Sequence, residues 1–183
     1  MKPNSIGASI EGVSVFNLDS HPDERGLFCE AFRAEWLAGA LGDELQMNCS
    51  LSRPGVIRGL HYHLRQADYW FLAAGRIEAA LVDLREGSPT FLAQQRFEMS
   101  PKRPLGIWIP AGVAHGYATL EPASLTYLVN RYFTGEDEYG LAWNDPELAI
   151  QWGVESPIVS RRDRNNPLLE ELDLEGIGRA VRG

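Results

Sequence analysis

From Leu45 onward the chain is dominated by short apolar runs that glycine, proline and acidic turns separate at regular intervals. Many short strands divided in this way are typical of an all-β sandwich or barrel. The number of runs favours a double-sheet jelly roll that holds a ligand in its mouth. The expected strands are residues 46–52, 56–64, 69–74, 77–84, 91–99, 105–109, 116–120 and 125–133.

The segments before and after these runs have a different character. Residues 8–17 and 27–32 are predicted to be strands, and residues 19–26 between them have the composition of a turn. Apolar residues at helical spacing predict a short helix near residues 32–41. A second short helix is predicted near residues 166–173, and the chain is expected to fray beyond it.

The length and charge of the chain limit the classes of function. With 183 residues it is large enough to bury a substantial core, and residues 1–183 are expected to form one domain. The net charge of −8 argues against nucleic-acid binding, because phosphate contacts need clustered basic residues. Arginine greatly outnumbers lysine, and its planar fork suits phosphate or carboxylate groups on a small ligand.

Two features bear on the compartment. Cys29 and Cys49 lie in strand-like runs without a disulfide framework, so reduced, buried thiols are expected. The N-terminus lacks an apolar leader, and no run approaches the length of a membrane span. A cytoplasmic protein without membrane contact is therefore predicted.

Three of the four histidines lie where strands are expected to begin or end. His61 and His63 are one residue apart in a strand-like run, so their rings should project from the same face. His115 follows a tight turn at Pro110 and Gly112. Each one alone could be an ordinary core or rim histidine, but three at the mouth of a barrel favour a shared site.

Two kinds of chemistry fit these residues, and the spacing does not choose between them. In one, His61 is a general base that a carboxylate orients, opposite a phenolic acid such as Tyr127. In the other, a transition metal binds to three histidines and one carboxylate. The ligands would be His61, His63, Asp68 and His115.

Six blocks of sequence, spread over nearly the whole chain, carry a family resemblance. They are Asp23–Gly26, Arg58–Tyr62, Gly87–Phe91, Ile109–Gly116, Trp143–Pro146 and Ser160–Asp163. Together they resemble the signature blocks of the dTDP-4-dehydrorhamnose 3,5-epimerase family. The resemblance implies a cupin-type jelly roll, a homodimer, and epimerisation of a dTDP-4-keto-6-deoxyhexose at C3, C5 or both, without metal or organic cofactor.

The resemblance also implies roles for individual residues. His61 matches the catalytic base, Tyr127 the acid, and Asp163 the carboxylate that holds the base. Base and acid on opposite faces of the sugar would let an enolate form and be reprotonated with inverted configuration. The matches to nucleotide- or sugar-binding positions are Arg25, Glu30, Gln46, Asn48, Arg58, His115, Glu138 and Arg162.

The chain departs from the family pattern just after His61. His63 replaces the usual glutamine, Asp68 stands where the family has a lysine that supports the enolate oxygen, and a small residue near Ala79 replaces an acid. Arg65 is a candidate for the missing charge. The same changes resemble the first motif of metal-binding cupins, in which an ion would replace the lysine as electrophile. On that interpretation His61 is a ligand and cannot be a free base.

Three alternatives to the full epimerase activity therefore stay open. They are epimerisation at C3 alone, a metal-binding cupin, and a non-catalytic nucleotide-sugar binder.

Two local features of the site also need an explanation. Arg58 and His61 are three residues apart, so their side chains would point to opposite faces of a regular strand. Gly59 is therefore expected to mark a bulge. Residues 136–138 are predicted to be a solvated turn in which only Glu138 matches the family.

Overall fold

The structure, a computed structural model, describes residues 3–37 and 39–183. Its strands are β1 (Asn4–Ile6), β2 (Ser14–Asn17), β3 (Ser20–Asp23), β4 (Gly26–Cys29), β5 (Gln46–Ser52), β6 (Val56–Tyr62), β7 (Asp68–Asp83), β8 (Gln94–Met99), β9 (Leu105–Ile109), β10 (Val113–Val129), β11 (Tyr139–Gly140) and β12 (Ile158–Val159). The helices are the 3₁₀ turns η1 (Ala34–Leu37), η2 (Asp163–Asn165) and η3 (Leu169–Glu171), and the α-helix α1 (Leu174–Arg182).

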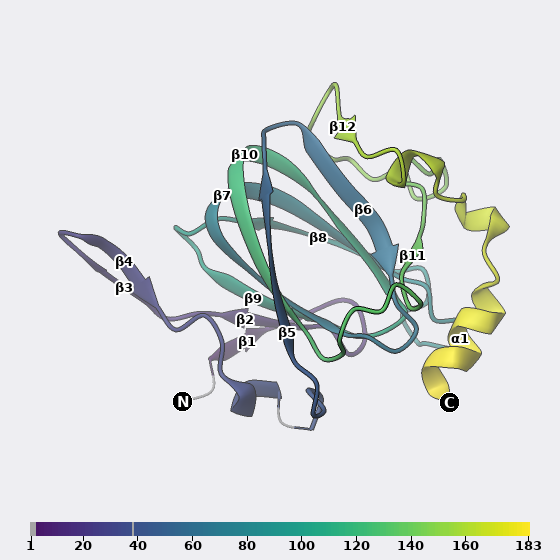
Figure 1. The fold of residues 1–183 in the computed structure, drawn as a ribbon, viewed down its shortest axis with the longest axis horizontal. Coiled ribbons are helices and arrows are strands. Elements are labelled where there is room, and N and C mark those ends of the chain that lie inside the picture. The colour runs from purple at the N-terminus through teal and green to yellow at the C-terminus, as the bar shows by residue number, and fades with distance from the viewer. Residues whose placement is uncertain (1–2, 38) are drawn as a thin grey trace.

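Two long antiparallel strands, β7 and β10, hold the fold together (Figure 1). The first half of β7 pairs with β9 and its second half with β8. The first half of β10 pairs with β6 and its second half with β5. One sheet therefore has the order β1-β2-β9-β7-β10-β5, and the other continues from the same two strands through β8, β6 and β11. This confirms the predicted all-β double-sheet jelly roll.

The bend between the two halves depends on Gly75. The register of β7 against β10 shifts between Thr119 and Leu125, opposite Gly75. Gly75 has a φ of 83°, and a Cβ atom there would lie 2.1 Å from the carbonyl oxygen of Pro122, so only glycine fits. The prediction that a turn at Gly75 separates two strands was wrong, because β7 bends without ending. For the same reason residues 116–120 and 125–129 belong to one strand.

Apolar side chains fill three regions around the sheets. Those between the sheets include Val15, Trp70, Leu72, Ile77, Leu81, Ile107 and Leu125. The C-terminal segment covers the outer face of the second sheet, where Ile57, Leu60, Val82, Leu141, Trp152, Leu169 and Ile177 are buried. A third group, around Phe16, Trp36 and Tyr69, lies at η1. The C-terminal segment thereby holds η2 close to β6.

Five predictions about the segments outside the main strands and about the cysteines need correction. Residues 20–23 form a strand, and they pair with β4 in a projecting hairpin whose turn is short. Residues 8–13 lie outside any strand. The tail that was expected to fray forms the helix α1 instead, and the Asp173 side chain caps it. The predicted helix near 32–41 is the short η1, and residue 38 lies outside the described residues. Both thiols are free, but they are not buried as predicted. Cys29 is half-buried and Cys49 is exposed.

No helix in residues 3–37 or 39–183 is long and apolar enough to cross a membrane.

Candidate active site

A cavity of about 670 Å³, called here the main cavity, lies against β5, β6, β7, β10 and the segment from β12 to η2. All the predicted site residues except Arg25 and Glu30 line it. The predicted residues that line the main cavity are His61, Tyr127, Asp163, Gln46, Asn48, Arg58, His115, Glu138 and Arg162. His63 and Asp68 line it as well.

His61 and Asp163 form a hydrogen-bonded pair, called here the dyad. Nε2 of His61 lies 2.7 Å from Oδ1 of Asp163, and the backbone N–H of Gly59 donates to the other carboxylate oxygen at 3.4 Å. Burial alone would raise the pKa of Asp163, but the hydrogen bond and charge of His61, together with hydrogen bonds from Gly59 and Ser160, lower that pKa below its ordinary value. The carboxylate is therefore ionised near neutral pH and orients the imidazole.

A bulge in β6 brings Arg58 and His61 to the same cavity. His61 pairs with His115 and Arg58 with Tyr117, so three residue steps on β6 face two on β10. Gly59, between them, has a φ of 119°, and a Cβ atom there would lie 2.7 Å from the Cα atom of the facing strand's Gly116. The predicted bulge is confirmed, and it resolves the problem of direction.

Tyr127 lines the main cavity from the second half of β10, where it pairs with Asn48 of β5 and Trp70 of β7. Burial raises the pKa of its phenol, and the nearby charge of Asp68 adds to the effect. The phenol is therefore protonated near neutral pH, so it can give a proton.

His63, Asp68 and His115 form a second group, called here the three-residue cluster. One potential ligand atom from each lies within 4.8 Å of the other two, and all three residues are buried. Burial lowers the pKa of His115, which favours its neutral form. The predicted four-ligand metal set is thus divided, because His61 is bonded to Asp163 instead. Arg65 is exposed and does not line the main cavity, so the suggestion that it replaces the lysine was wrong.

Asp137 anchors the segment that carries this cluster. Its carboxylate accepts hydrogen bonds from the backbone N–H groups of Leu64, Arg65 and Gln66 at 2.8, 3.0 and 3.0 Å, and its carbonyl oxygen is bonded to the His63 ring. The prediction of a solvated turn was wrong for Asp137, which is half-buried. A single aspartate in an acidic run carries no sequence signal for this contact.

Two arginines lie at the rim of the main cavity. Arg58 is exposed, and its Nε donates to the Ser52 hydroxyl at 3.0 Å. Arg162 forms an ion pair of 2.7 Å with Glu138. Arginine forks of this kind bind phosphate groups in two-point contacts.

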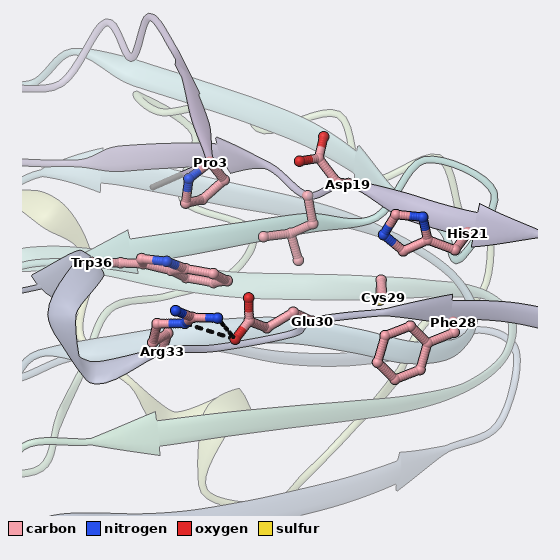
Figure 2. Close-up of a pocket in the computed structure, with 9 residues that line it drawn as sticks. Pro3, Asp19, His21, Phe28, Cys29, Glu30, Arg33 and Trp36 are labelled. Atoms are coloured by element: carbon pink, nitrogen blue, oxygen red, sulfur yellow. Dashed lines mark hydrogen bonds and ion pairs between the residues drawn. The ribbon is translucent and has the colours of Figure 1, made fainter. Parts of the chain in front are cut away.

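Arg25 and Glu30 lie elsewhere, on and beside the β3–β4 hairpin that projects from the body of the molecule (Figure 1). Arg25 bonds to Asp23 in the hairpin turn. Glu30 faces a second cavity, of about 590 Å³, where Arg33 holds its carboxylate at 2.7 Å (Figure 2). Within one chain these two residues therefore do not reach the main cavity.

Comparison with known proteins places this geometry in a family. Residues 7–171 match the family described as dTDP-4-dehydrorhamnose 3,5-epimerase. The Pseudomonas aeruginosa enzyme of that name is 37% identical over 172 residues, which span 90% of this chain and 95% of the relative. The chain belongs to the dTDP-4-dehydrorhamnose 3,5-epimerase family.

Solved structures of the family agree with the fold. The dTDP-6-deoxy-D-glucose-3,5-epimerase of Legionella pneumophila, in complex with dTDP-4-keto-L-rhamnose, is 35% identical with a TM-score of 0.85, over 94% of this chain and 95% of that one. A 3′-monoepimerase of Streptomyces bikiniensis, in complex with dTDP-quinovose, is 31% identical with a TM-score of 0.85, over 100% and 96%. The family therefore contains epimerases of one centre and of two.

Two of the family's sequence blocks support the fold and not the cavity. Ser88 and Thr90 donate from their hydroxyls to the fully buried Asp83, each at 2.7 Å. Asp145, also buried, accepts the backbone N–H of Leu169 at 2.8 Å, which ties the C-terminal segment to the body. The blocks Gly87–Phe91 and Trp143–Pro146 therefore contain residues whose buried hydrogen bonds stabilise the fold.

Proposed function

We propose that this protein epimerises a dTDP-linked 4-keto-6-deoxyhexose next to its ketone, with His61 as the base and Tyr127 as the acid. The observation that carries the proposal is the 2.7 Å dyad at a cavity that a protonated tyrosine also lines. The similarity to an epimerase solved with dTDP-4-keto-L-rhamnose supports the choice of substrate.

In this proposal each nitrogen of His61 has a separate task. Because the carboxylate of Asp163 only accepts hydrogen bonds, Nε2 carries the hydrogen and Nδ1 has the free lone pair. Nδ1 removes the proton that the C4 ketone makes acidic, an enolate forms, and Asp163 stabilises the resulting imidazolium. Tyr127 then gives its proton to the opposite face of the same carbon. The ketone is restored with inverted configuration, and solvent resets both side chains.

The polar residues at the rim suit the nucleotide half of the substrate. Arg58 and Arg162 would bind the diphosphate, with Gln46, Asn48 and Glu138 positioning the rest. Phe133 lines the same cavity and exposes 63% of its surface, so it offers an aromatic face for thymine.

The test is solvent deuterium exchange into the substrate in D₂O, followed by NMR or mass spectrometry. His61→Ala is expected to abolish exchange at C3, and its thermal unfolding would show that the variant is folded. Exchange at the wild-type rate in that variant would remove His61 as the base. Protein that binds dTDP and exchanges nothing would instead be a nucleotide-sugar binder.

The same assay separates the two kinds of epimerase. Epimerisation at C3 alone is the second candidate, because the resemblance puts Asp68 in the place of the family lysine and a monoepimerase is among the similar structures. Deuterium at C3 and C5 would establish the two-centre activity, whereas deuterium at C3 alone would establish the one-centre activity.

The proposal includes a homodimer in which the hairpin of each chain reaches the partner's main cavity. Strand β5 is at a sheet edge and exposes Met47 and Leu51, and the hairpin exposes Phe28, each by 69–75%. Apolar surface of this kind marks an interface, and the crossing would bring Arg25 and Glu30 to the nucleotide. A cytoplasmic location is part of the same proposal, and the two free cysteines suit it.

Mixing inactive variants tests the crossing. In a heterodimer of Arg25→Ala and His61→Ala chains, one of the two sites would have both residues intact. If subunits exchange at random, about a quarter of the wild-type activity should return. A mixture that stays as inactive as its components, although the subunits have exchanged, would show that each chain uses its own Arg25.

A further inference from the structure

Three segments distant in sequence meet at the three-residue cluster. His63 follows β6, Asp68 begins β7, and His115 lies near the start of β10. Nε2 of His63 lies 3.9 Å from Oδ1 of Asp68, and Nε2 of His115 lies 3.7 Å from Oδ2. These separations are too long for hydrogen bonds, so the two rings surround the carboxylate without contacting it.

Backbone carbonyl groups determine the tautomer of both rings. Nδ1 of His63 bonds to the carbonyl oxygen of Asp137, and Nδ1 of His115 bonds to that of Val113 at 3.0 Å. Because a carbonyl oxygen only accepts, the hydrogen of each neutral ring is on Nδ1 and the lone pair on Nε2. Both lone pairs therefore lie on the side of Asp68. Histidine ligands of metal ions are held by outer hydrogen bonds of this kind.

Asp68 has little compensation for its charge. It is 3% exposed, and in the described parts of the chain no arginine or lysine forms an ion pair with it. Among residues 3–37 and 39–183, the donors to its side chain are the Gln66 amide, at 2.9 Å, and the Trp70 indole, at 3.3 Å. The same Gln66 amide nitrogen lies 3.1 Å from Nε2 of His63. The Gln66 amide nitrogen thus lies between an imidazole and a carboxylate. A cation in its place would satisfy both groups.

We propose that His63, Asp68 and His115 bind one divalent transition-metal ion at the wall of the main cavity. Two imidazoles and a carboxylate on one side of an ion suit Fe²⁺, Mn²⁺, Co²⁺ or Zn²⁺ and leave other positions open. A small movement of the side chains, with displacement of the Gln66 amide, would bring the three ligand atoms to about 2.1 Å from one ion.

The role of the ion rests on the proposed function. The charge of the ion would stabilise the C4 enolate oxygen, the task that the resemblance assigns to a lysine at the position of Asp68. His61 cannot be a metal ligand and a free base at once, but this arrangement does not require it to be both, because His61 is held by Asp163 and is no part of the cluster. His61 would act on the sugar as the base, and the ion bound by the three-residue cluster would act on the same sugar.

The first test measures binding without turnover. Protein treated with chelator and then dialysed is titrated with Co²⁺ and Zn²⁺, by calorimetry and by the visible absorption of Co²⁺. One ion per chain is expected, and His63→Gln and Asp68→Asn should each weaken binding at least about tenfold. Asp43→Asn is the matched control for Asp68→Asn, because Asp43 is exposed, does not line the main cavity and lies outside the β3–β4 hairpin. Absence of saturable binding, or binding that survives both cluster variants, would overturn the proposal.

The second test measures deuterium exchange in metal-free and metal-loaded protein. A rate that falls about a hundredfold on removal of the ion and returns with Co²⁺ or Zn²⁺ would support the electrophilic role. An exchange rate that does not depend on the ion would overturn that role. Stoichiometric binding with no exchange in either form would support the metal site and overturn the proposed function.

Discussion

The main cavity contains two groups of histidine and carboxylate that are built in opposite ways. In the dyad, imidazole and carboxylate are in contact at 2.7 Å, and the histidine side chain is 24% exposed. In the three-residue cluster, the nearest approaches are 3.7 and 3.9 Å, and every member is buried. The dyad satisfies its own charges, whereas in the cluster the two rings are held apart from the carboxylate, and the Gln66 amide donates to Asp68 at 2.9 Å and lies 3.1 Å from Nε2 of His63.

This difference separates two kinds of chemistry that share the same residue types. A carboxylate in contact with an imidazole fixes the tautomer of the ring and orients it for proton transfer. A carboxylate held apart from two oriented imidazoles is arranged for a positive charge between them. The same main cavity can therefore contain a base and a site for an electrophile.

The largest expected effect is on the dyad. Asp163→Asn should lower the exchange rate by about 10²- to 10⁴-fold, because the amide no longer stabilises the imidazolium. The fall should be in kcat more than in KM, and Co²⁺ binding at the cluster should persist. Steady-state kinetics and calorimetry on one preparation would check both parts. A variant with more than half of the wild-type kcat would break the distinction between the two groups.

The two aspartates should also differ in their effect on folding. In metal-free protein, Asp163→Asn should lower the free energy of unfolding by about 1–3 kcal/mol, because it breaks a buried, charge-assisted hydrogen bond. Asp68→Asn should leave that free energy unchanged or raise it, because it removes a poorly compensated buried charge. Urea unfolding of both variants would measure the contrast. Equal losses would mean that the cluster satisfies its own charge as the dyad does.

A change at the rim should leave both groups intact. Arg58→Ala should raise KM about tenfold with little change in kcat, because the guanidinium is expected to bind the diphosphate before and during the reaction alike. Arg53→Ala is the matched control, because Arg53 is exposed and does not line the main cavity. If kcat fell instead, Arg58 would act in the transition state and the assignment would need revision.

The smallest effect concerns pH. The pKa of Asp163 is lower in the folded chain than in the unfolded chain, so its contribution to stability is complete above the unfolded value of about 4. That contribution should disappear as the pH falls through the lower folded value. The difference in unfolding free energy between wild type and Asp163→Asn should therefore be constant from about pH 5 to 8 and shrink in acid. A difference that grows in acid would contradict the lowered pKa.

Much of the fold was predictable because strand length and turn residues are local properties. The predicted bounds of β5 and β9 agree with the structure residue for residue. The errors occurred where a local signal has two outcomes, as at Gly75, which bends a strand that the pattern had divided. Only the approach of Pro122 from the facing strand decides between a bend and a turn.

The sequence by itself determined the family, the jelly roll and most of the residues around the main cavity, because these depend on residue types in a fixed order. Tertiary structure alone decided which of the four candidate metal ligands belong together. It pairs His61 with Asp163 and gathers the other three in the cluster. His61 meets a carboxylate 102 positions away, while His63 is turned by the carbonyl of Asp137 toward Asp68. Which nitrogen faces which carboxylate depends on a bulge at Gly59 and a loop anchored from another segment. Neither contact leaves a trace in the spacing of the histidines.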